Sequence, residues 1–253
     1  MPPPPDFPRV LAEQLRADGS RPLVTFYDDA TGERVELSVV TYANWVAKTA
    51  SLVSDELMVE RGGLALVDLP THWLAPVWLG ALWSVGLTVT ADPSRAAEVD
   101  LVVCGPEGLA RYAEPAGAAT APASDVPVVA LSLLPMAGRF TEPLPPGVTD
   151  FSQVVWGQPD LFVPVDLPLP GDRAWAGSDG TLTQQEVLAE AAGTSGRLLT
   201  EVAPTSRAGL SAFLGPLQSG DGTVWVRHAA PDRRAERAAA ERAVLWPGHP
   251  PRS

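Results

Sequence analysis

The sequence contains few of the residues that most often carry catalytic or metal chemistry. Among its 253 residues are one cysteine, Cys104, one lysine, Lys48, and three histidines, His72, His228 and His249. A single cysteine excludes an intrachain disulfide framework, and no cysteine and histidine cluster has the spacing of a zinc site. The histidines are far apart in the chain and are interpreted as structural or solvated. We therefore assign no catalytic residue and no metal ligand.

Basic charge is scarce as well. The chain has 18 Lys and Arg residues against 30 Asp and Glu residues, which gives a formal net charge of -12. This balance excludes nucleic acid as an expected partner, because phosphate contacts require clustered basic side chains. Hydrophobic residues make up 45% of the chain, as in globular proteins. The start, "MPPPPDFPRV", has neither the basic nor the apolar region of a secretory signal, which predicts a cytoplasmic protein.

One long apolar run without charged residues spans residues 73–91, "WLAPVWLGALWSVGLTVTA". A helix that crosses a bilayer needs about 20 consecutive apolar residues, so this run tests the expectation of a soluble protein. Gly86 divides it into a helical part and a β-branched part, "LTVT", and no basic flank orients it. We therefore predict no membrane span here, but a buried helix followed by a strand.

Helical and strand-like patterns alternate along the chain. Helices are expected near residues 8–17, 41–57, 71–85, 182–199, 206–217 and 232–245, and strands in "PLVTFYD", "ERVELS", "LALVDLP", "LTVTAD", "DLVVC", "PVVALSLL", "RAWAG" and "GTVWVR". Ser38 or Thr41 is the expected N-cap of the second helix, and Thr71 that of the third. The alternation predicts an α/β fold, with a mostly parallel sheet and flanking helices.

Several prominent polar and aromatic residues are interpreted as structural. Asp28 and Asp29 lie at the tip of the first predicted hairpin, where we expect them to be solvated. Lys48 is expected on a solvated helix surface, and Cys104 ends the apolar run "DLVVC", which predicts a buried side chain. Four tryptophans belong to the two early helices that we expect to pack together: Trp45, Trp73, Trp78 and Trp83.

The chain is expected to form a single domain over residues 1–253. Residues 135–171 hold many prolines and few regular patterns. Such a segment is either a surface excursion or a linker. In the second case it joins two lobes, about 1–134 and 172–247.

The segment "AWAGSDGTLTQQEVLAEAAG", residues 174–193, passes from a strand through a small-residue loop into a helix. This order is how many proteins hold a phosphate, because the free N–H groups of a helix start bind anions. The candidate cofactor-binding residues are Gly177, Ser178, Gly180 and Thr181, and ATP or AMP is the cofactor that they would hold. The loop contains no lysine or arginine, which favours the alternative of a simple turn.

The start of the following helix supports the structural alternative. Thr183 is a good N-cap, and Glu186 stands three residues later, so "TQQE" predicts a capping box. A capping box satisfies the first helical N–H groups from within the protein, in competition with any phosphate. Asp179 also adds a negative charge where a phosphate would lie.

A resemblance to a known family covers most of the chain. The segments "TYANWVAKTASLV" and "GGLALVDLPTHWLAPVWLGALWSVGLTVTAD" resemble the opening of the acyl-adenylate-forming enzymes, which include acyl-CoA synthetases, luciferases and peptide-synthetase adenylation domains. "LTQQEVLAEA" resembles the helix after that family's phosphate loop, and "GLSAFLGPLQSGDGTVWV" resembles a later helix and strand. The resemblance implies the fold of the amino-terminal part of the family's large domain.

The departures from the family pattern determine the functional expectation. The family loop reads approximately "TSGTTGxPKG", whereas here "AGSDGT" is followed directly by "LTQQEV". The "YGxTE" adenine motif, the ribose-binding aspartate segment and the small domain with its catalytic lysine have no counterpart. The resemblance therefore implies a truncated, degenerate form without ligase activity, a pseudoenzyme that acts by binding a protein partner or a small acyl or nucleotide ligand. Two alternatives stay open, a nucleotide-binding enzyme and one half of a split ligase.

Overall fold

The structure, a computed structural model, describes residues 5–113 and 121–248. Its helices are α1 (Phe7–Asp18), α2 (Val39–Ser51), α3 (Leu74–Val85), α4 (Leu109–Tyr112), α5 (Phe151–Val154), α6 (Gln184–Ala191), α7 (Arg207–Ser219) and α8 (Arg234–Ala240). Its strands are β1 (Pro22–Asp28), β2 (Glu33–Ser38), β3 (Leu64–Asp68), β4 (Thr88–Thr90), β5 (Leu101–Cys104), β6 (Val128–Ala130), β7 (Val148–Asp150), β8 (Arg173–Gly177), β9 (Gly180–Thr183), β10 (Leu198–Thr200), β11 (Thr223–Arg227) and β12 (Val244–Leu245). The predicted α/β fold with mostly parallel strands and flanking helices is confirmed.

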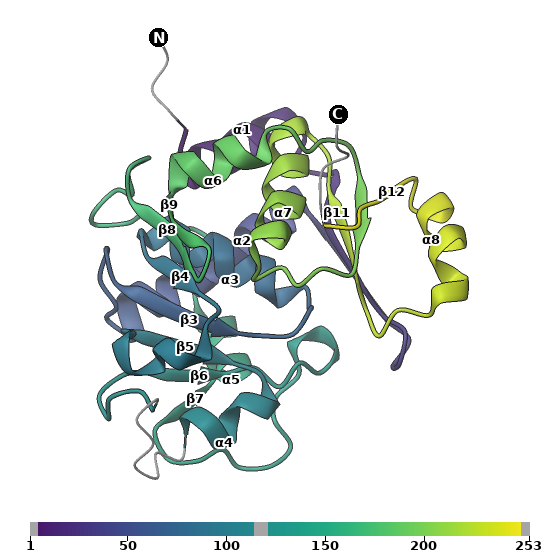
Figure 1. Cartoon of the computed structure of the whole chain (residues 1–253). Helices are drawn as coiled ribbons and strands as arrows, with labels where there is room; N and C mark the ends of the chain where they lie inside the picture. The colour runs from purple at the N-terminus through teal and green to yellow at the C-terminus, as the bar shows by residue number, and fades with distance from the viewer. Residues whose placement is uncertain (1–4, 114–120, 249–253) are drawn as a thin grey trace.

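The strands form two sheets rather than one (Figure 1). The first sheet has the order β12-β10-β11-β1-β2, and the second has the order β7-β6-β5-β3-β4-β8-β9. Neighbouring strands are parallel except at β2 and β9, which end the sheets as antiparallel partners of β1 and β8. The sheets do not follow the boundaries of the two expected lobes. Strand β1 pairs with β11, and the segment 135–171 contributes β7 to the second sheet.

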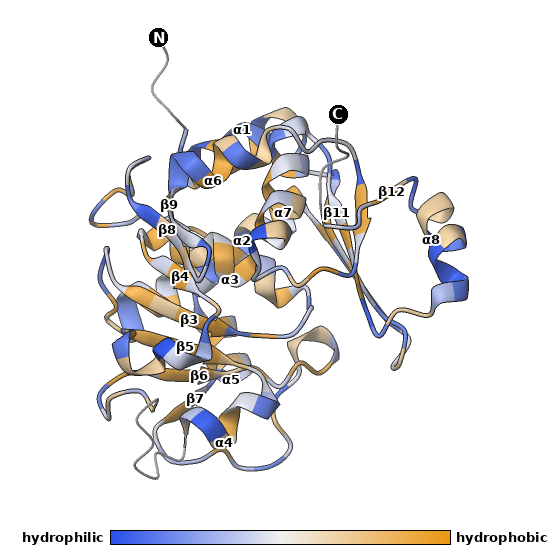
Figure 2. Cartoon of the chain, in the orientation of Figure 1, coloured by the Kyte–Doolittle hydropathy of each residue, from blue (hydrophilic) through white to orange (hydrophobic). Residues whose placement is uncertain are grey.

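Helices α1, α2, α3, α6 and α7 lie in a layer between the sheets and carry the main core. Helix α3 is apolar on every side and all of its residues are buried, as its position in this layer requires. Figure 2 shows α3, β3, β5 and β6 in the colours of hydrophobic residues, whereas α8 presents polar residues at the outer edge. Two smaller clusters cover the outer faces: one lies around Tyr112 and Cys104, the other around Leu199, Val226 and Ala238.

The two early helices pack together as the tryptophan pattern predicts. The ring centroids of Trp45 and Trp73 are 5.1 Å apart, and Trp78 and Trp83 are fully buried. Ser38 caps α2, since its Oγ accepts a hydrogen bond from the Thr41 N–H. The capping role expected for Thr71 is wrong.

Helix α3 begins three residues after Thr71, at Leu74, because a different side chain serves its first turn. Nδ1 of His72 accepts a hydrogen bond from the Leu74 N–H over 3.2 Å. The helix ends at Gly86, which has a φ of 87° and leads into β4. In residues 5–113 and 121–248 no helix combines the length and the apolarity that crossing a membrane requires.

Three further expectations need correction. The helix expected over residues 182–199 ends at Ala191, because Gly196 turns the chain with a φ of 82° and residues 198–200 form β10. Asp29 is not solvated: its side chain is 7% exposed and is paired with Arg237 of α8. Lys48 is not free in solvent either, since its Nζ lies 3.1 Å from Asp160.

Candidate functional site

The candidate phosphate loop is the tip of a β-hairpin. Gly177 pairs with Gly180 across β8 and β9, and Ser178 and Asp179 form the two-residue turn between them. Gly180 has a φ of 118°, which only glycine adopts without strain. Residues 180–183 therefore form strand β9 before helix α6 begins, where the sequence predicted a loop directly before the helix. Ser178, Gly180 and Thr181 are exposed.

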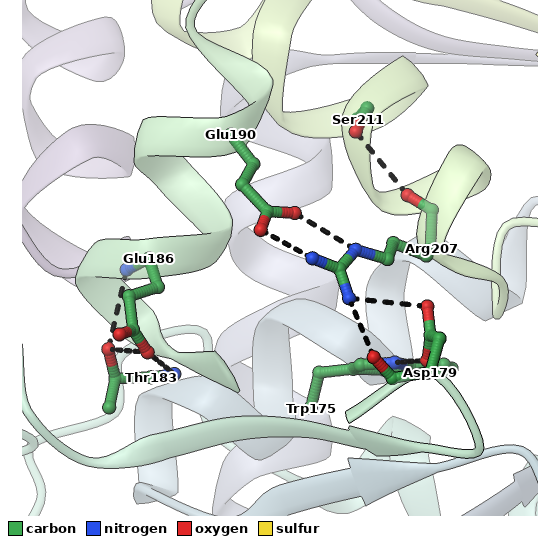
Figure 3. Close-up of polar contacts among 7 residues, drawn as sticks. All are labelled: Trp175, Asp179, Thr183, Glu186, Glu190, Arg207 and Ser211. Carbon is green, nitrogen blue, oxygen red and sulfur yellow. Dashed lines mark hydrogen bonds and ion pairs between the residues drawn. The ribbon is translucent and has the colours of Figure 1, made fainter. Parts of the chain in front are cut away.

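The structure brings to this loop a cation that sequence reasoning missed. Arg207, in the first turn of α7, donates from Nη1 to the Asp179 carbonyl over 3.2 Å and to its Oδ2 over 3.4 Å. Its Nε donates to Oε2 of Glu190 over 3.0 Å, so that the guanidinium lies between two carboxylates (Figure 3). The hydrogen bond to Glu190 raises the pKa of Arg207 further. Asp179 also accepts a hydrogen bond from the indole N–H of Trp175.

The predicted capping box at the start of α6 is confirmed. Oε2 of Glu186 accepts from the Thr183 N–H over 2.8 Å, and Oγ1 of Thr183 accepts from the Glu186 N–H over 3.4 Å (Figure 3). The backbone hydrogen bond from Thr183 lowers the pKa of Glu186. Two of the N–H groups at this helix start are thus satisfied by side chains of the helix itself.

Replacement of Thr183 with alanine is expected to lower the free energy of unfolding by about 1 kcal/mol, because the N-cap hydrogen bond is lost. Urea unfolding followed by far-UV circular dichroism measures the change. Thr181→Ala is the matched control, since the Thr181 side chain makes no cap and lies exposed on β9. Equal losses in the two variants would contradict a stabilising capping box.

A second candidate site is a cavity of about 530 Å³ that we call the inter-sheet cavity. Its lining comes from the carboxyl ends of β1 and β11 of the first sheet and of β3, β5 and β6 of the second. The chain passes from β3 to β4 on one side of β3 and returns to β5 on the other. Ligands of open α/β sheets bind at such switch points, outside the carboxyl ends of the strands.

A hydrogen-bonded pair on one side and an ion pair on the other organise the polar lining of the inter-sheet cavity. Nδ1 of His228 lies 2.8 Å from Oδ1 of Asp28, whose side chain is 7% exposed. Burial opposes the charge of Asp28, but the hydrogen bond with His228 leaves its pKa below the ordinary value. Asp28 is therefore a buried partner and not the solvated hairpin residue that the sequence predicted. On the opposite wall Asp68 accepts hydrogen bonds from Arg111 over 2.6 Å and from Tyr112 over 2.7 Å.

His72 also lines the inter-sheet cavity, and its burial fixes its chemical form. The side chain is 1% exposed, and burial lowers its pKa to about 3, so the ring is neutral at pH 7. Since Nδ1 accepts from Leu74, the ring proton belongs on Nε2. That atom is buried and has no hydrogen-bond partner among the described residues. His72 follows β3 of the second sheet and His228 follows β11 of the first, so two residues 156 positions apart (228 − 72) line one cavity, an arrangement that no local pattern signals.

Backbone strain accompanies this cavity. His228 has a φ of 51° and Leu133 a φ of 57°, values that are uncommon for residues with a side chain. Both residues line the inter-sheet cavity. Strained conformations persist only where the surroundings fix them, and they cluster at ligand sites.

The other residues that the sequence singled out are not part of a site. Cys104 is buried as predicted, and burial raises the pKa of its thiol to about 12. His249 lies outside the described residues. Within residues 5–113 and 121–248 no group of three His, Cys, Asp or Glu side chains is arranged to hold a metal ion.

Comparison with known proteins finds a protein that is similar in sequence and several solved structures that are similar in fold. No family model matches the chain. A protein of Mycobacterium tuberculosis (strain ATCC 25618 / H37Rv), described as a "TIGR03089 family protein", is 42% identical over 161 residues, which are 64% of this chain and 63% of that protein. The chain thus covers less than two thirds of this relative.

Three similar solved structures are two acyl-CoA synthetases and a CoA ligase. Brucella canis acyl-CoA synthetase has a TM-score of 0.73 at 17% identity, and Mycobacterium tuberculosis fatty acyl CoA synthetase has 0.69 at 11%. The anthranilate CoA ligase AuaEII, solved with anthranoyl-AMP, has 0.68 at 12%. Each match covers 94% of this chain but only 47–48% of the other. The chain therefore has the fold of the amino-terminal part of the acyl-CoA synthetases, as the sequence resemblance predicted.

Proposed function

We propose that this chain uses an adenylate-forming fold to bind a protein partner or a small ligand, and that it does not catalyse ligation. The observation that carries the proposal is the charge balance around the hairpin tip at residues 177–181. Arg207, a cation that reaches this tip, is engaged by Asp179 and Glu190. Two carboxylates and one guanidinium leave the tip with a local excess of negative charge, which disfavours the phosphates of ATP.

The chemistry of adenylation explains why negative charge at the hairpin tip opposes ligase activity. A ligase has to hold ATP, magnesium and a carboxylate around one phosphorus atom, and most of the catalysis comes from positioning and charge compensation. A phosphate at Ser178 or Thr181 would have to displace Asp179 from Arg207. It would also compete with the Glu186 carboxylate for the Thr183 N–H and with the Thr183 hydroxyl for the Glu186 N–H.

Nucleotide binding is the second candidate, and Arg207 is the observation that favours it. The Arg207 side chain is 36% exposed. Its guanidinium could therefore release Asp179 and bind a phosphate oxygen without any unfolding of the protein. In that case Gly177, Ser178, Gly180 and Thr181 would contact ATP or AMP. The same residues would serve one half of a split ligase whose other parts come from another chain.

Pyrophosphate exchange tests the proposal. The purified chain is expected to exchange no labelled pyrophosphate into ATP with any member of a panel of short, long and aromatic carboxylates, because the tip does not compensate the phosphate charge. Calorimetry with ATP, AMP and a non-hydrolysable acyl-adenylate analogue, with and without magnesium, is expected to give no heat of binding. Exchange that is abolished in Ser178→Ala or Thr181→Ala would refute the proposal and establish the enzymatic alternative.

A further inference from the structure

A row of exposed aliphatic side chains follows the segment 159–170, which we call the strap. The strap lies between α5 and β8 in the chain and belongs to neither sheet. Every second residue along it is aliphatic and more than half exposed: Leu161, Val163, Val165, Leu167 and Leu169. Val165, at a bend of the chain, is 96% exposed. Single exposed apolar residues are ordinary, but a contiguous row of them marks a surface that another molecule covers.

An apolar groove of about 430 Å³ runs beside the strap. One wall is the strap itself, with Leu161 and Leu167, and helices α1 and α2 supply further walls, with Leu11, Leu15 and Ala43. Val163 and Val165 do not line the groove. The strap therefore borders an apolar hollow and also carries apolar side chains outside it. A surface with both features can pack against an identical surface across a two-fold axis, because each copy supplies what the other requires.

The pattern of the strap is symmetric about Val165. Aliphatic residues stand two and four positions away from it in both directions along the chain. A two-fold axis at Val165 with the two straps antiparallel therefore places Leu161 opposite Leu169 of the second copy, and Val163 opposite Leu167. Since Leu161 and Leu167 are groove walls, Leu169 and Val163 of the second copy lie at the groove.

The charges around the strap favour a protein over a lipid surface. Asp160 is the charged residue of the groove lining, and it is paired with Lys48 over 3.1 Å. Asp172, directly after the strap, is paired with Arg61 over 2.6 Å. Covering this surface therefore buries few unpaired charges, as the core of a protein interface requires. Binding to a membrane surface depends on clustered basic residues, which the strap and the groove lining do not contain.

The size of the surface suits a stable dimer. A standard interface takes about 20–30 residues from each partner. The strap supplies 12 residues, and α1, α2 and α3 supply ten more that line the groove. Interfaces of this size have affinities from about micromolar to about picomolar.

We propose that two copies of this chain associate through their straps, antiparallel across a two-fold axis at Val165, with the aliphatic row of each copy packed on the strap and groove of the other. The contact goes beyond the binding role proposed above. Neither the strap nor the groove includes a residue of the hairpin tip 177–181, so the contact requires no nucleotide.

Sedimentation equilibrium of the whole chain tests the association. The parent is expected to be a dimer at about 100 µM. Val163→Asp and Val165→Asp are each expected to weaken the dimer at least about tenfold, because each places a carboxylate without a counter-charge in the contact. Val244→Asp is the matched control and is expected to dimerise as the parent does, since Val244 is 67% exposed on β12, outside the strap and the groove. A monomeric parent at about 100 µM, or a dimer that both strap variants leave unchanged, would overturn the proposal.

Cross-linking tests the position of the axis and does not depend on the aspartate variants. The parent has one cysteine, Cys104, and it is buried. In Val165→Cys the new thiol meets its counterpart at the axis, within the Cα separation of about 7 Å that a disulfide spans. With diamide as oxidant it is expected to form a covalent dimer at least about tenfold faster than Val244→Cys. Equal rates for the two variants would place the contact elsewhere and overturn the proposed axis.

A lipid surface is the competing occupant, and flotation with phosphatidylcholine vesicles detects it. The parent is expected to stay with the soluble fraction. A monomeric parent that floats with the vesicles, and no longer does so as Val165→Asp, would assign the strap to a membrane and overturn the dimer. These results are independent of pyrophosphate exchange, so failure here and failure of the proposed function are distinguishable.

Discussion

Trp83→Ala is expected to lower the free energy of unfolding by about 4 kcal/mol, as large deletions in a packed core do. The Trp83 side chain is fully buried near the end of α3, and its ring centroid lies 5.4 Å from that of Phe7 in α1. Its indole N–H donates to the carbonyl oxygen of Ala174 over 2.9 Å. One side chain thus joins α3, α1 and β8, the strand that carries the hairpin tip, and its loss leaves a cavity and removes the indole hydrogen bond to the Ala174 carbonyl.

The measurement is urea unfolding followed by far-UV circular dichroism, which does not depend on the fluorescence of the deleted residue. Trp156→Ala is the control, because the Trp156 side chain is 54% exposed, and its loss is expected to cost less than about 1 kcal/mol. Trp83→Phe should fall between the two, since it restores most of the volume but not the hydrogen bond. Similar values for Trp83→Ala and Trp156→Ala would contradict the role assigned to Trp83.

Arg237→Met is expected to lower the free energy of unfolding by about 3 kcal/mol at pH 7, because it leaves a buried carboxylate without its counter-charge. In the folded protein the Arg237 and Asp29 side chains are 11% and 7% exposed. Nη1 of Arg237 donates to Asp29 over 3.1 Å, and its guanidinium lies 4.4 Å from the ring centroid of Tyr27. The pair attaches α8 to the outer face of the first sheet.

The same variant has a distinct pH dependence. The hydrogen bond from Arg237 holds the pKa of Asp29 below its ordinary value. A carboxyl with a depressed folded pKa stabilises the protein above its unfolded pKa, and this contribution is lost as the pH falls through the folded pKa. The difference in stability between the parent and Arg237→Met should therefore be largest near neutral pH and should shrink in acid.

Arg234→Met is the matched control on the same helix. Arg234 pairs with Glu201, but their side chains are 46% and 37% exposed, and such surface pairs contribute between about 0 and 1 kcal/mol. We expect a small effect that does not change between pH 7 and acid. A constant difference for Arg237→Met over the same pH series would show that packing against Tyr27 matters and the ion pair does not.

Features that depend on neighbouring residues could be predicted from the sequence. Ser38 stands at the start of α2, and Thr183 and Glu186 are three positions apart, so their caps are local and both predictions were confirmed. The apolar pattern of residues 74–85 likewise identified a buried helix. The start of α3 was missed because the sequence offered Thr71 as the ordinary cap, whereas the N-cap is Trp73, whose side chain makes no capping hydrogen bond.

Features that depend on the pairing of distant strands could not be predicted. Asp28 and Asp29 belong to an unremarkable hairpin in the sequence, yet β11 and α8 bring His228 and Arg237 against them. Arg207 reaches Asp179 because α7 starts beside the hairpin tip, 28 positions downstream. The inter-sheet cavity needs the ends of strands from two sheets at once. The sequence predicted the strands whose ends line this cavity, but not their arrangement in two sheets, and it did not predict β7, β9, β10 and β12.

The pairing of β1 with β11 also determines the order in which the chain can fold as it is synthesised. Asp28 and His228 are 200 positions apart, so β1 leaves the ribosome long before its parallel neighbour exists. The strands of the second sheet lie between these two positions, within residues 64–183, and they can associate earlier. Pairings between distant segments form late because closing a long loop costs entropy. Until β11 arrives, β1 has β2 on one edge and an unpaired edge on the other, and this open edge is where a stalled or slowly translated chain is most exposed to aggregation.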